Sequence, residues 1–180
     1  MELLEASDQM LLEQMAAGSE PAFTTLYRRH QGRVYRFAYG MCGSAALAED
    51  VTQEVFLALI HRPREYHARR GPLEAYLVGI ARNQTLRALK RERAFTPLPE
   101  LEIAGVEAGS REMVEAVRKA VLSLPADYRE VVVLCELEGL EYAEAAVALG
   151  CPIGTVRSRL HRARALLLDK LTARNLGNLA

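Results

Sequence analysis

Apolar residues recur every three or four positions along most of this chain, which is the period of an amphipathic helix. Near the start, Ser7 or Asp8 can cap a short helix that ends at Ala17, before Gly18. Ser19 then opens a longer helix. Its apolar positions are Phe23, Leu26, Tyr27, Val34, Phe37, Ala38 and Met41. The pattern therefore predicts two helices before Gly43.

Two further helices are predicted before the middle of the chain. Gly43 and Ser44 end the long helix and cap the next, which covers about 45–61. A loop follows, and Pro72 starts a helix that runs to about Arg93. One face of that helix is apolar, with Leu73, Leu77, Ile80 and Ala81. We therefore expect residues 1–93 to form one helical domain.

Residues 94–110 differ from both halves, with two prolines, two glycines, an acidic balance and no helical period. This composition is typical of a flexible linker. Helical periodicity returns with Val114, Val117, Val121 and Leu124, and predicted helices follow at 126–138, 141–149 and after Pro152. No segment has a strand pattern. The fold class is thus predicted to be all-α, with two small domains, 1–93 and 111–180, joined by the linker.

The most informative segment is residues 141–170. A short helix ends at Leu149-Gly150, and a second helix opened by Pro152 carries four arginines with no acidic residue between Glu144 and Asp169. Two helices joined by a tight glycine turn, the second of them basic, are typical of a helix-turn-helix that places its second helix in the DNA major groove.

Charge supports this interpretation only when it is examined locally. The formal net charge of the 180 residues is zero, and half of the residues are hydrophobic, enough for a core. Residues 19–93, however, hold thirteen Arg plus Lys against seven Asp plus Glu, a net charge of +6. Residues 94–112 have one basic and four acidic residues. A neutral chain with a basic segment can still bind a polyanion.

Other classes of site are not indicated. Cys42, Cys135 and Cys151 are far apart and have no metal-ligand spacing, so reduced cysteines and no metal or cofactor are expected. The acidic start lacks a signal peptide, and no apolar run has the roughly 20 residues that span a bilayer. The four histidines are isolated, and no nucleophile–base pair or phosphate-binding glycine loop is present. We expect a cytoplasmic protein that is not an enzyme and has no small-molecule substrate.

The basic helix after Gly150 has one face suited to DNA. Residues three or four apart share a helical face, and arginine can bind guanine O6 and N7 together, or a phosphate. The side chains predicted to bind duplex are Thr155, Arg157, Ser158, Arg159, His161, Arg162 and Arg164. The opposite face, with Val156, Leu160, Ala163 and Leu167, is expected to pack on the first helix. A solvated basic face is the plainer alternative.

Two clusters in the first domain are less specific. Glu49, Asp50, Gln53 and Glu54 form a polar stripe, which is either an ordinary solvated face or a docking face for a basic partner. Between Arg62 and Arg93, basic residues are interleaved with Tyr66 and Tyr76. Basic residues follow a nucleic-acid backbone and aromatic rings stack on unpaired bases, so this cluster suits single-stranded or melted DNA. A plain basic surface remains the alternative.

These clusters, in this order, resemble the extracytoplasmic-function (ECF) sigma factors of bacterial RNA polymerase. The family's helix that docks on the clamp helices of the largest polymerase subunit is similar to AEDVTQEVFLAL. Its −10 recognition helix is similar to GPLEAYLVGIARNQTLRALKRER. Its fourth region, which binds the −35 element, is similar to LPADYREVVVLCELEGLEYAEAAVALGCPIGTVRSRLHRAR. The resemblance covers about 19–171.

The resemblance implies a role for each cluster. Asp50, Gln53 and Glu54 are expected to contact core polymerase, and the basic helix after Gly150 to bind the −35 duplex. The side chains expected to bind the −10 element are Tyr66, Arg69, Arg70, Tyr76, Arg82, Asn83 and Arg87. The implied partners are core RNA polymerase (clamp helices and flap), promoter DNA and an anti-sigma protein, with the linker running toward the RNA exit path.

The chain departs from the family at three positions. Tyr76 stands where tryptophan is usual, and Cys135 stands where many members carry an arginine close to the −35 backbone. Glu141 replaces the Ser or Thr that caps the first helix of the motif, so that helix is expected to start about 1 kcal/mol more weakly. The sequence does not determine whether the free chain is compact or open.

Two other functions stay open on the residues alone. A helix-turn-helix regulator that binds duplex DNA without polymerase accounts for the C-terminal half and leaves residues 1–93 unexplained. A helical protein-interaction module is the second. An assay of promoter-directed transcription with polymerase distinguishes a sigma factor from both alternatives.

Overall fold

The computed structural model describes residues 6–95 and 110–177, and every regular element in these ranges is helical, which confirms the all-α prediction. The first range holds α1 (Asp8–Ala16), α2 (Glu20–Cys42), α3 (Ala45–His61), the short turns η1 (Pro63–Glu65) and η2 (Ala68–Arg70), and α4 (Leu73–Phe95). The second holds α5 (Ser110–Leu122), α6 (Ala126–Val132), η3 (Val133–Leu137), α7 (Tyr142–Leu149) and α8 (Ile153–Gly177). The predicted linker lies mostly in 96–109, outside the described residues.

Serine caps fix the starts of the first three helices. The hydroxyl oxygens of Ser7, Ser19 and Ser44 each accept a hydrogen bond, 3.3 Å long, from the backbone N–H three residues later. Each bond satisfies one of the N–H groups that a helix start leaves without a partner. Gly43 ends α2 in the left-handed conformation, with φ of 71°. These starts and this end lie where the sequence predicts them.

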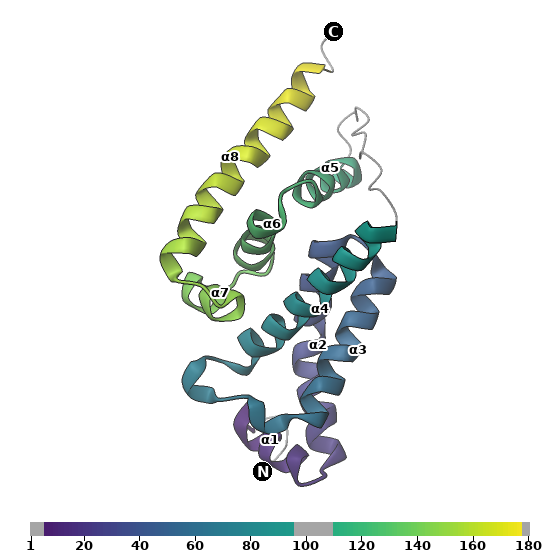
Figure 1. Ribbon diagram of the computed structural model, residues 1–180, viewed down its shortest axis with the longest axis vertical. Coiled ribbons are helices and arrows are strands. Elements are labelled where there is room, and N and C mark those ends of the chain that lie inside the picture. The colour runs from purple at the N-terminus through teal and green to yellow at the C-terminus, as the bar shows by residue number, and fades with distance from the viewer. Residues whose placement is uncertain (1–5, 96–109, 178–180) are drawn as a thin grey trace.

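The N-terminal domain is a bundle of α2, α3 and α4, with α1 lying across one end near the N-terminus (Figure 1). Its core consists of the apolar stripes of the three helices. Fully buried members include Leu26, Phe37, Met41, Leu59 and Leu77. The polar faces of α3 and α4 are thereby directed outward, so the predicted contact residues are held on a rigid scaffold.

The C-terminal domain is built around α6 and α8, with α7 joining them (Figure 1). Its buried residues include Leu124, Leu134, Val156, Leu160 and Ala163. The last three are the apolar face that the sequence assigns to packing on the rest of the motif. α8 is therefore held by its apolar side, and its basic side is left at the surface.

The helix predicted over 126–138 is not uniform. α6 gives way at Val133 to the π-helical turn η3, in which the N–H of Glu138 donates to the carbonyl of Val133 at 2.9 Å. Wider turns of this kind accommodate an extra residue within a helix. Val133 of this turn packs against Gly40 of α2, and Glu138 directly after it accepts a hydrogen bond from Arg36 of α2. The irregular turn is therefore also a point of contact with the N-terminal domain.

The start of α7 is better supported than its sequence suggests. Glu141 occupies the N-cap position, and its backbone N–H donates to the carboxylate of Glu144 at 3.2 Å. A Ser or Thr cap accepts a hydrogen bond from a backbone N–H of the first turn, whereas here a side chain of the first turn accepts from the backbone N–H of the cap residue. The predicted loss of about 1 kcal/mol took account of the Glu141 side chain alone, without this bond to Glu144.

The two domains pack against each other and share a continuous hydrophobic core. α7 lies on α4, while α5, α6 and η3 lie along α2. The buried Arg129 of α6 donates hydrogen bonds to the carbonyl of Met41 in α2 and, at 2.9 Å, to the carbonyl of Leu124. Within the described residues the free chain is therefore compact, a point that the sequence left open.

Candidate nucleic-acid interface

The helix-turn-helix positions α8 through a left-handed glycine. Gly150 has φ of 62°, a conformation that glycine adopts without a steric penalty, and it ends α7 so that α8 can start at once. The side chains of Arg157, Ser158, His161 and Arg162 are exposed on α8. These four side chains, all predicted to bind the −35 element, are placed where a DNA groove could reach them.

The other three side chains predicted to bind the −35 element are less available. Arg159 pairs with Asp127 of α6 at 3.0 Å, and its side chain is 25% exposed. Arg164 pairs with Glu136 of η3 although its side chain is 57% exposed, and Thr155 is half-buried. Arg159 and Arg164 are thus tied by ion pairs to the elements that precede α8.

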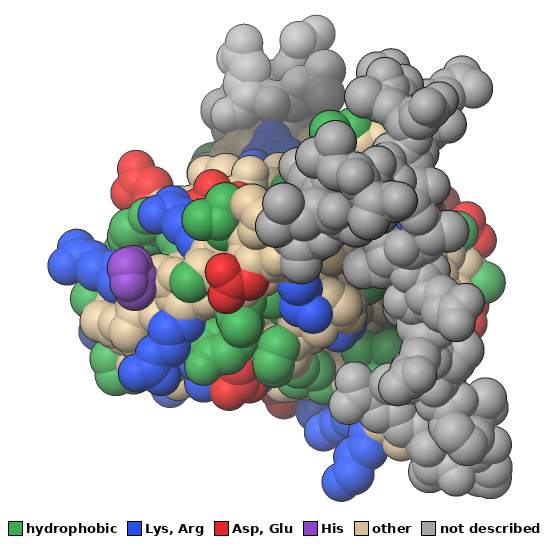
Figure 2. Space-filling model, turned by 90° about the horizontal axis from the view of Figure 1, so that it is seen from above, with side chains coloured by type: hydrophobic (Ala, Val, Ile, Leu, Met, Phe, Trp, Pro, Cys, Tyr) green, Lys and Arg blue, Asp and Glu red, His purple; other side chains and the backbone are tan. Residues whose placement is uncertain are grey.

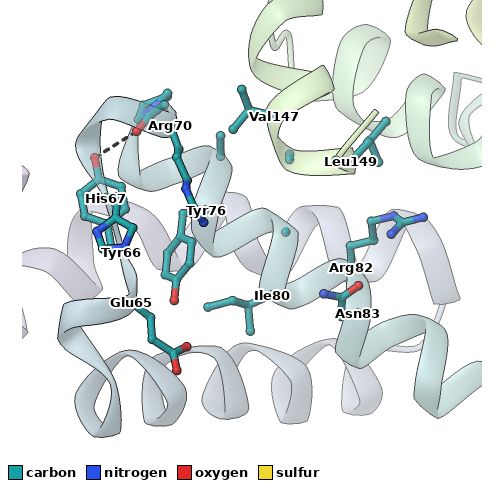
Figure 3. A pocket seen from close by; sticks show the side chains of 16 residues that line it. Glu65, Tyr66, His67, Arg70, Tyr76, Ile80, Arg82, Asn83, Val147 and Leu149 are labelled. Atoms are coloured by element: carbon teal, nitrogen blue, oxygen red, sulfur yellow. Dashed lines mark hydrogen bonds between the residues drawn. The ribbon is translucent and has the colours of Figure 1, made fainter. Parts of the chain in front are cut away.

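The side chains predicted to bind the −10 element converge on a cavity between the two domains. Tyr66, Arg70, Tyr76, Arg82 and Asn83 line a space of about 400 Å³ beside α4. Figure 3 shows Tyr66 on the connection between η1 and η2, Arg70 on η2 and the other three on α4, with Val147 and Leu149 of α7 lying over them. Arg69 lines a different hollow, beside α1. Arg87 is exposed farther along α4.

The two tyrosines support each other. Their ring centroids are 5.6 Å apart at an angle of 53°, and the Tyr66 hydroxyl donates to the carbonyl of Gly71 at 3.1 Å. Burial raises the pKa of both hydroxyls, so both stay neutral and can donate. The pair forms an apolar wall with polar tips, which suits an unpaired base.

Arg82 is engaged across the domain boundary. Its Nε donates to Oε1 of Glu130 in α6 at 2.9 Å, and the Glu130 side chain has no exposed surface. Burial raises the pKa of the Glu130 carboxyl, although the Arg82 guanidinium acts in the opposite direction. Sequence reasoning identified Arg82 and missed Glu130, because the partners are 48 positions apart.

The polar stripe of α3 is a separate surface. Glu49, Asp50, Gln53 and Glu54 are all exposed, and the last three line a hollow of about 450 Å³ that also includes Arg91 of α4. Sequence reasoning missed Leu57 and Ile60, which are 47% and 44% exposed on the same helix. The sequence did contain a clue, because Leu57 and Ile60 do not lie on the helical face that Val51, Val55 and Leu59 bury. Exposed leucine and isoleucine beside carboxylates are typical of a protein-binding surface.

Charges of both signs are interspersed on the face of the molecule that Figure 2 shows. Seen from above, Lys and Arg side chains lie among Asp and Glu (Figure 2). The pairs Arg36–Glu138, Arg82–Glu130, Arg159–Asp127 and Arg164–Glu136 account for part of this mixture. Carboxylates of the segment from α6 to Glu138 thus occupy arginines on three other helices.

Residues 6–95 and 110–177 contain no cluster of three His, Cys, Asp or Glu side chains that could hold a metal ion. The three cysteines are half-buried and not disulfide-bonded, and burial raises the pKa of the Cys135 thiol. None of the described helices is both long and apolar enough to cross a bilayer.

Two family models match this chain in the order of its domains. Sigma-70 region 2 matches residues 26–95, and Sigma-70, region 4 matches residues 114–167. The first match contains the α3 stripe and the side chains predicted to bind the −10 element, and the second contains the helix-turn-helix. The segment between the matches includes the predicted linker.

Curated relatives carry the same assignment. The ECF RNA polymerase sigma factor SigM of Mycobacterium tuberculosis is 33% identical over 96% of this chain and 89% of its own length. The ECF RNA polymerase sigma-E factor of Escherichia coli K12 is 30% identical over 93% of this chain and 95% of its own. SigE of Mycolicibacterium smegmatis is 37% identical over 84% of this chain, which spans 62% of that longer protein.

Solved structures agree in fold across both domains. CnrH, in complex with the cytosolic domain of CnrY, matches 93% of this chain and 99% of its own, with a TM-score of 0.70 and 29% identity. The sigma factor RpoE of Bartonella quintana, in complex with the anti-sigma factor NepR, matches 83% of this chain and 96% of its own, with a TM-score of 0.69 and 26% identity. With both sigma-70 regions present and full-length relatives of this identity, the chain belongs to the ECF sigma factors, the alternative sigma factors that direct transcription by RNA polymerase.

Proposed function

We propose that this sigma factor binds core RNA polymerase through α3 and reads two promoter elements, one with each domain. The observation that supports this most strongly is the packing of α8. Its apolar face is buried by the preceding helices, and Arg157, Ser158, His161 and Arg162 are exposed together. This arrangement suits major-groove reading of the −35 duplex.

The −10 element is assigned to the cavity beside α4. Tyr66 and Tyr76 provide an apolar wall, Asn83 an amide with donors and an acceptor, and Arg70 and Arg82 positive charge. Extruding a base from the duplex costs a few kcal/mol of lost stacking and pairing, and contacts of this kind must offset that cost. The cavity therefore suits a base of the opened strand rather than duplex DNA.

Core polymerase is assigned to the exposed stripe of α3, where Asp50, Gln53 and Glu54 stand beside Leu57 and Ile60. The polymerase surfaces that we expect to be contacted are the clamp helices of the largest subunit and the flap. An anti-sigma protein is a further proposed partner, since CnrH and RpoE are both seen in complexes, the latter with an anti-sigma factor. We place the protein in the cytoplasm with the polymerase and assign it no catalytic activity.

Run-off transcription with purified core polymerase and a randomised promoter library tests this proposal. The wild-type chain is expected to select two short elements. Changing Arg162 to Ala is expected to weaken −35 recognition by about 1–3 kcal/mol, which is roughly 5-fold to 150-fold in affinity for the element. A matched control is Arg28→Ala, which removes the same charge from α2.

The alternatives give different results in the same assay. Unchanged transcription by a variant with Ala at Arg157, Ser158 and Arg162 would contradict −35 reading and favour a protein-interaction module. Tight binding of a palindromic duplex by the chain without polymerase would favour a stand-alone regulator.

A further inference from the structure

Two arginines lie at opposite edges of the exposed face of α8. This reading face consists of four exposed side chains, Arg157, Ser158, His161 and Arg162. Because an α-helix turns by about 100° per residue, they cover roughly 140° of its circumference. In the same projection, Arg164 lies about 20° beyond one end of that arc and Arg159 about 60° beyond the other. The far side of the helix is occupied by the buried Val156, Leu160 and Ala163.

Each edge arginine is held by a carboxylate from the segment that precedes α7. Nη2 of Arg159 donates to Oδ2 of Asp127, at the start of α6, at 3.0 Å. Nη2 of Arg164 donates to Oε1 of Glu136 in η3, and this hydrogen bond raises the pKa of the guanidinium. Since α6 packs against α8 (Figure 1), the two carboxylates emerge at opposite edges of the reading face.

The core of the domain does not require either carboxylate. The side chains of Asp127 and Glu136 are 61% and 41% exposed, and ion pairs between exposed groups contribute little to folding. Their position is instead important for what α8 binds. A helix in the major groove has a phosphate backbone on each side, and the groove and the helix are both roughly 12 Å across. Residues at the edges of the reading face are therefore the ones that meet phosphates.

A carboxylate beside an arginine limits the phosphates that the arginine can reach. The guanidinium has five N–H donors in a fixed fork, and a carboxylate takes one or two of them, so the others point in a fixed direction. A phosphate in that direction is bound with the pair intact. A phosphate elsewhere is bound only if the pair opens, and an exposed pair is worth about 1.5-fold to fivefold in an equilibrium constant.

We propose that Asp127 and Glu136 are positioning residues that set the specificity of −35 reading. They hold Arg159 and Arg164 in the directions of the phosphates that flank the reading face when it is seated on its element, and they weaken phosphate contacts at other sequences. Phosphate contacts carry no sequence information by themselves, so restricting them to the seated position makes them a source of discrimination. This inference rests on the −35 assignment of the proposed function.

Binding of the holoenzyme to two duplexes tests the proposal. Core polymerase is combined with each variant of the full chain, and anisotropy is measured with a fluorescent duplex that carries the −35 element returned by the run-off library. The second duplex has the bases of that element in shuffled order. The ratio of the two affinities measures specificity, and a salt series on each duplex measures how many phosphates are contacted.

Asp127→Asn keeps the shape of the side chain and removes its charge. It should tighten binding of the shuffled duplex by about twofold to fivefold without tightening binding of the element, so the affinity ratio falls by that factor. One freed arginine should also steepen the dependence of log K on log salt for the shuffled duplex by about 0.9. Glu136→Gln should have the same effects through Arg164.

Further variants separate positioning from charge. Asp169→Asn removes a carboxylate from an exposed position of α8 and leaves both pairs intact, so any gain in affinity should be equal for the two duplexes. Arg159→Ala should weaken binding of the element and hardly affect the shuffled duplex. In the Asp127→Asn, Arg159→Ala double variant, the gain for the shuffled duplex should disappear, because no arginine is left to be freed.

The opposite outcomes count against the proposal. If Asp127→Asn and Glu136→Gln both keep the wild-type affinity ratio, the two carboxylates do not set specificity. If the gain of Asp127→Asn persists without Arg159, it comes from net charge and not from positioning. If the wild-type holoenzyme binds both duplexes equally, the −35 assignment itself fails, and the positioning role that rests on it fails too.

Discussion

Asp8 joins α1 to α2 through two side chains. His30 Nε2 is 2.9 Å from one carboxylate oxygen, and Arg29 donates to the other and to the Ala6 carbonyl. Burial opposes ionisation of Asp8, but the hydrogen bonds and charges of His30 and Arg29 outweigh it, and the pKa of the carboxyl lies below its ordinary value. The ionised form therefore stabilises the folded state.

We predict that Asp8→Asn lowers the free energy of unfolding at pH 7 by roughly 1.5 kcal/mol. Because the folded pKa is lowered, this contribution is complete above the unfolded pKa of about 3.9 and is lost as the pH falls through the folded value. Urea denaturation at pH 7 and pH 3 should show the difference from wild type shrinking in acid. Glu13→Gln, on the exposed side of α1, is the control. A difference that stays constant with pH would contradict the assignment.

At the residue scale, sequence indicates which side chains are charged but not which ones pair. Arg159 and Arg82 have the right type and helical position for DNA contacts, and the chain shows no local sign that Asp127 and Glu130 hold them. Those carboxylates lie 32 and 48 positions away. The exposed Arg157, Ser158 and Arg162 were predictable because no acidic residue of their own helix is near them.

At the element scale, helix starts were predictable where a serine precedes an apolar period, because the cap and the period are both local. The change from α6 to η3 was not, because the run from 126 to 138 reads equally well as one regular helix. Leu57 and Ile60 of α3 were also passed over, since their exposure depends on how the bundle rotates that helix.

The α3 surface leads to a prediction of its own. Asp50→Lys should reduce retention on immobilised core polymerase by about tenfold, because it reverses a charge in the centre of the proposed contact. Asp50 is exposed and has no role in the core, so folding should be unaffected. Glu20→Lys makes the same change at the start of α2 and should be retained like the wild type. Equal retention of both variants would exclude α3 from the contact.

At the scale of the whole molecule, the all-α class and the order of the two regions could be predicted, whereas their packing could not. The contacts between the domains use residues that also have local explanations. Gly43 is a helix end, Gly40 and Gly79 are tolerated helix glycines, and Arg129 is one basic residue among many. All of them lie at contacts between the two domains, which become apparent only once α2 and α4 are placed beside η3 and α7.

A shared core has a calorimetric consequence. We predict that the wild-type chain unfolds in one transition, because neither domain can lose its packing without exposing the other. At Gly40 an added Cβ would lie 2.9 Å from a methyl carbon of Val133, so Gly40→Ala pushes α2 and η3 apart and should unfold in two transitions by differential scanning calorimetry. Gly154→Ala makes the same substitution where an added Cβ meets nothing within 4 Å, and it should keep one transition. A single transition in the Gly40 variant would mean that the domains remain coupled.

The buried Glu130 makes one contact between the domains depend on pH. Burial raises the pKa of its carboxyl, so as the pH falls this group takes up a proton before an exposed glutamate does. Its ion pair with Arg82 then loses one of its two charges, and the contact between α4 and α6 weakens.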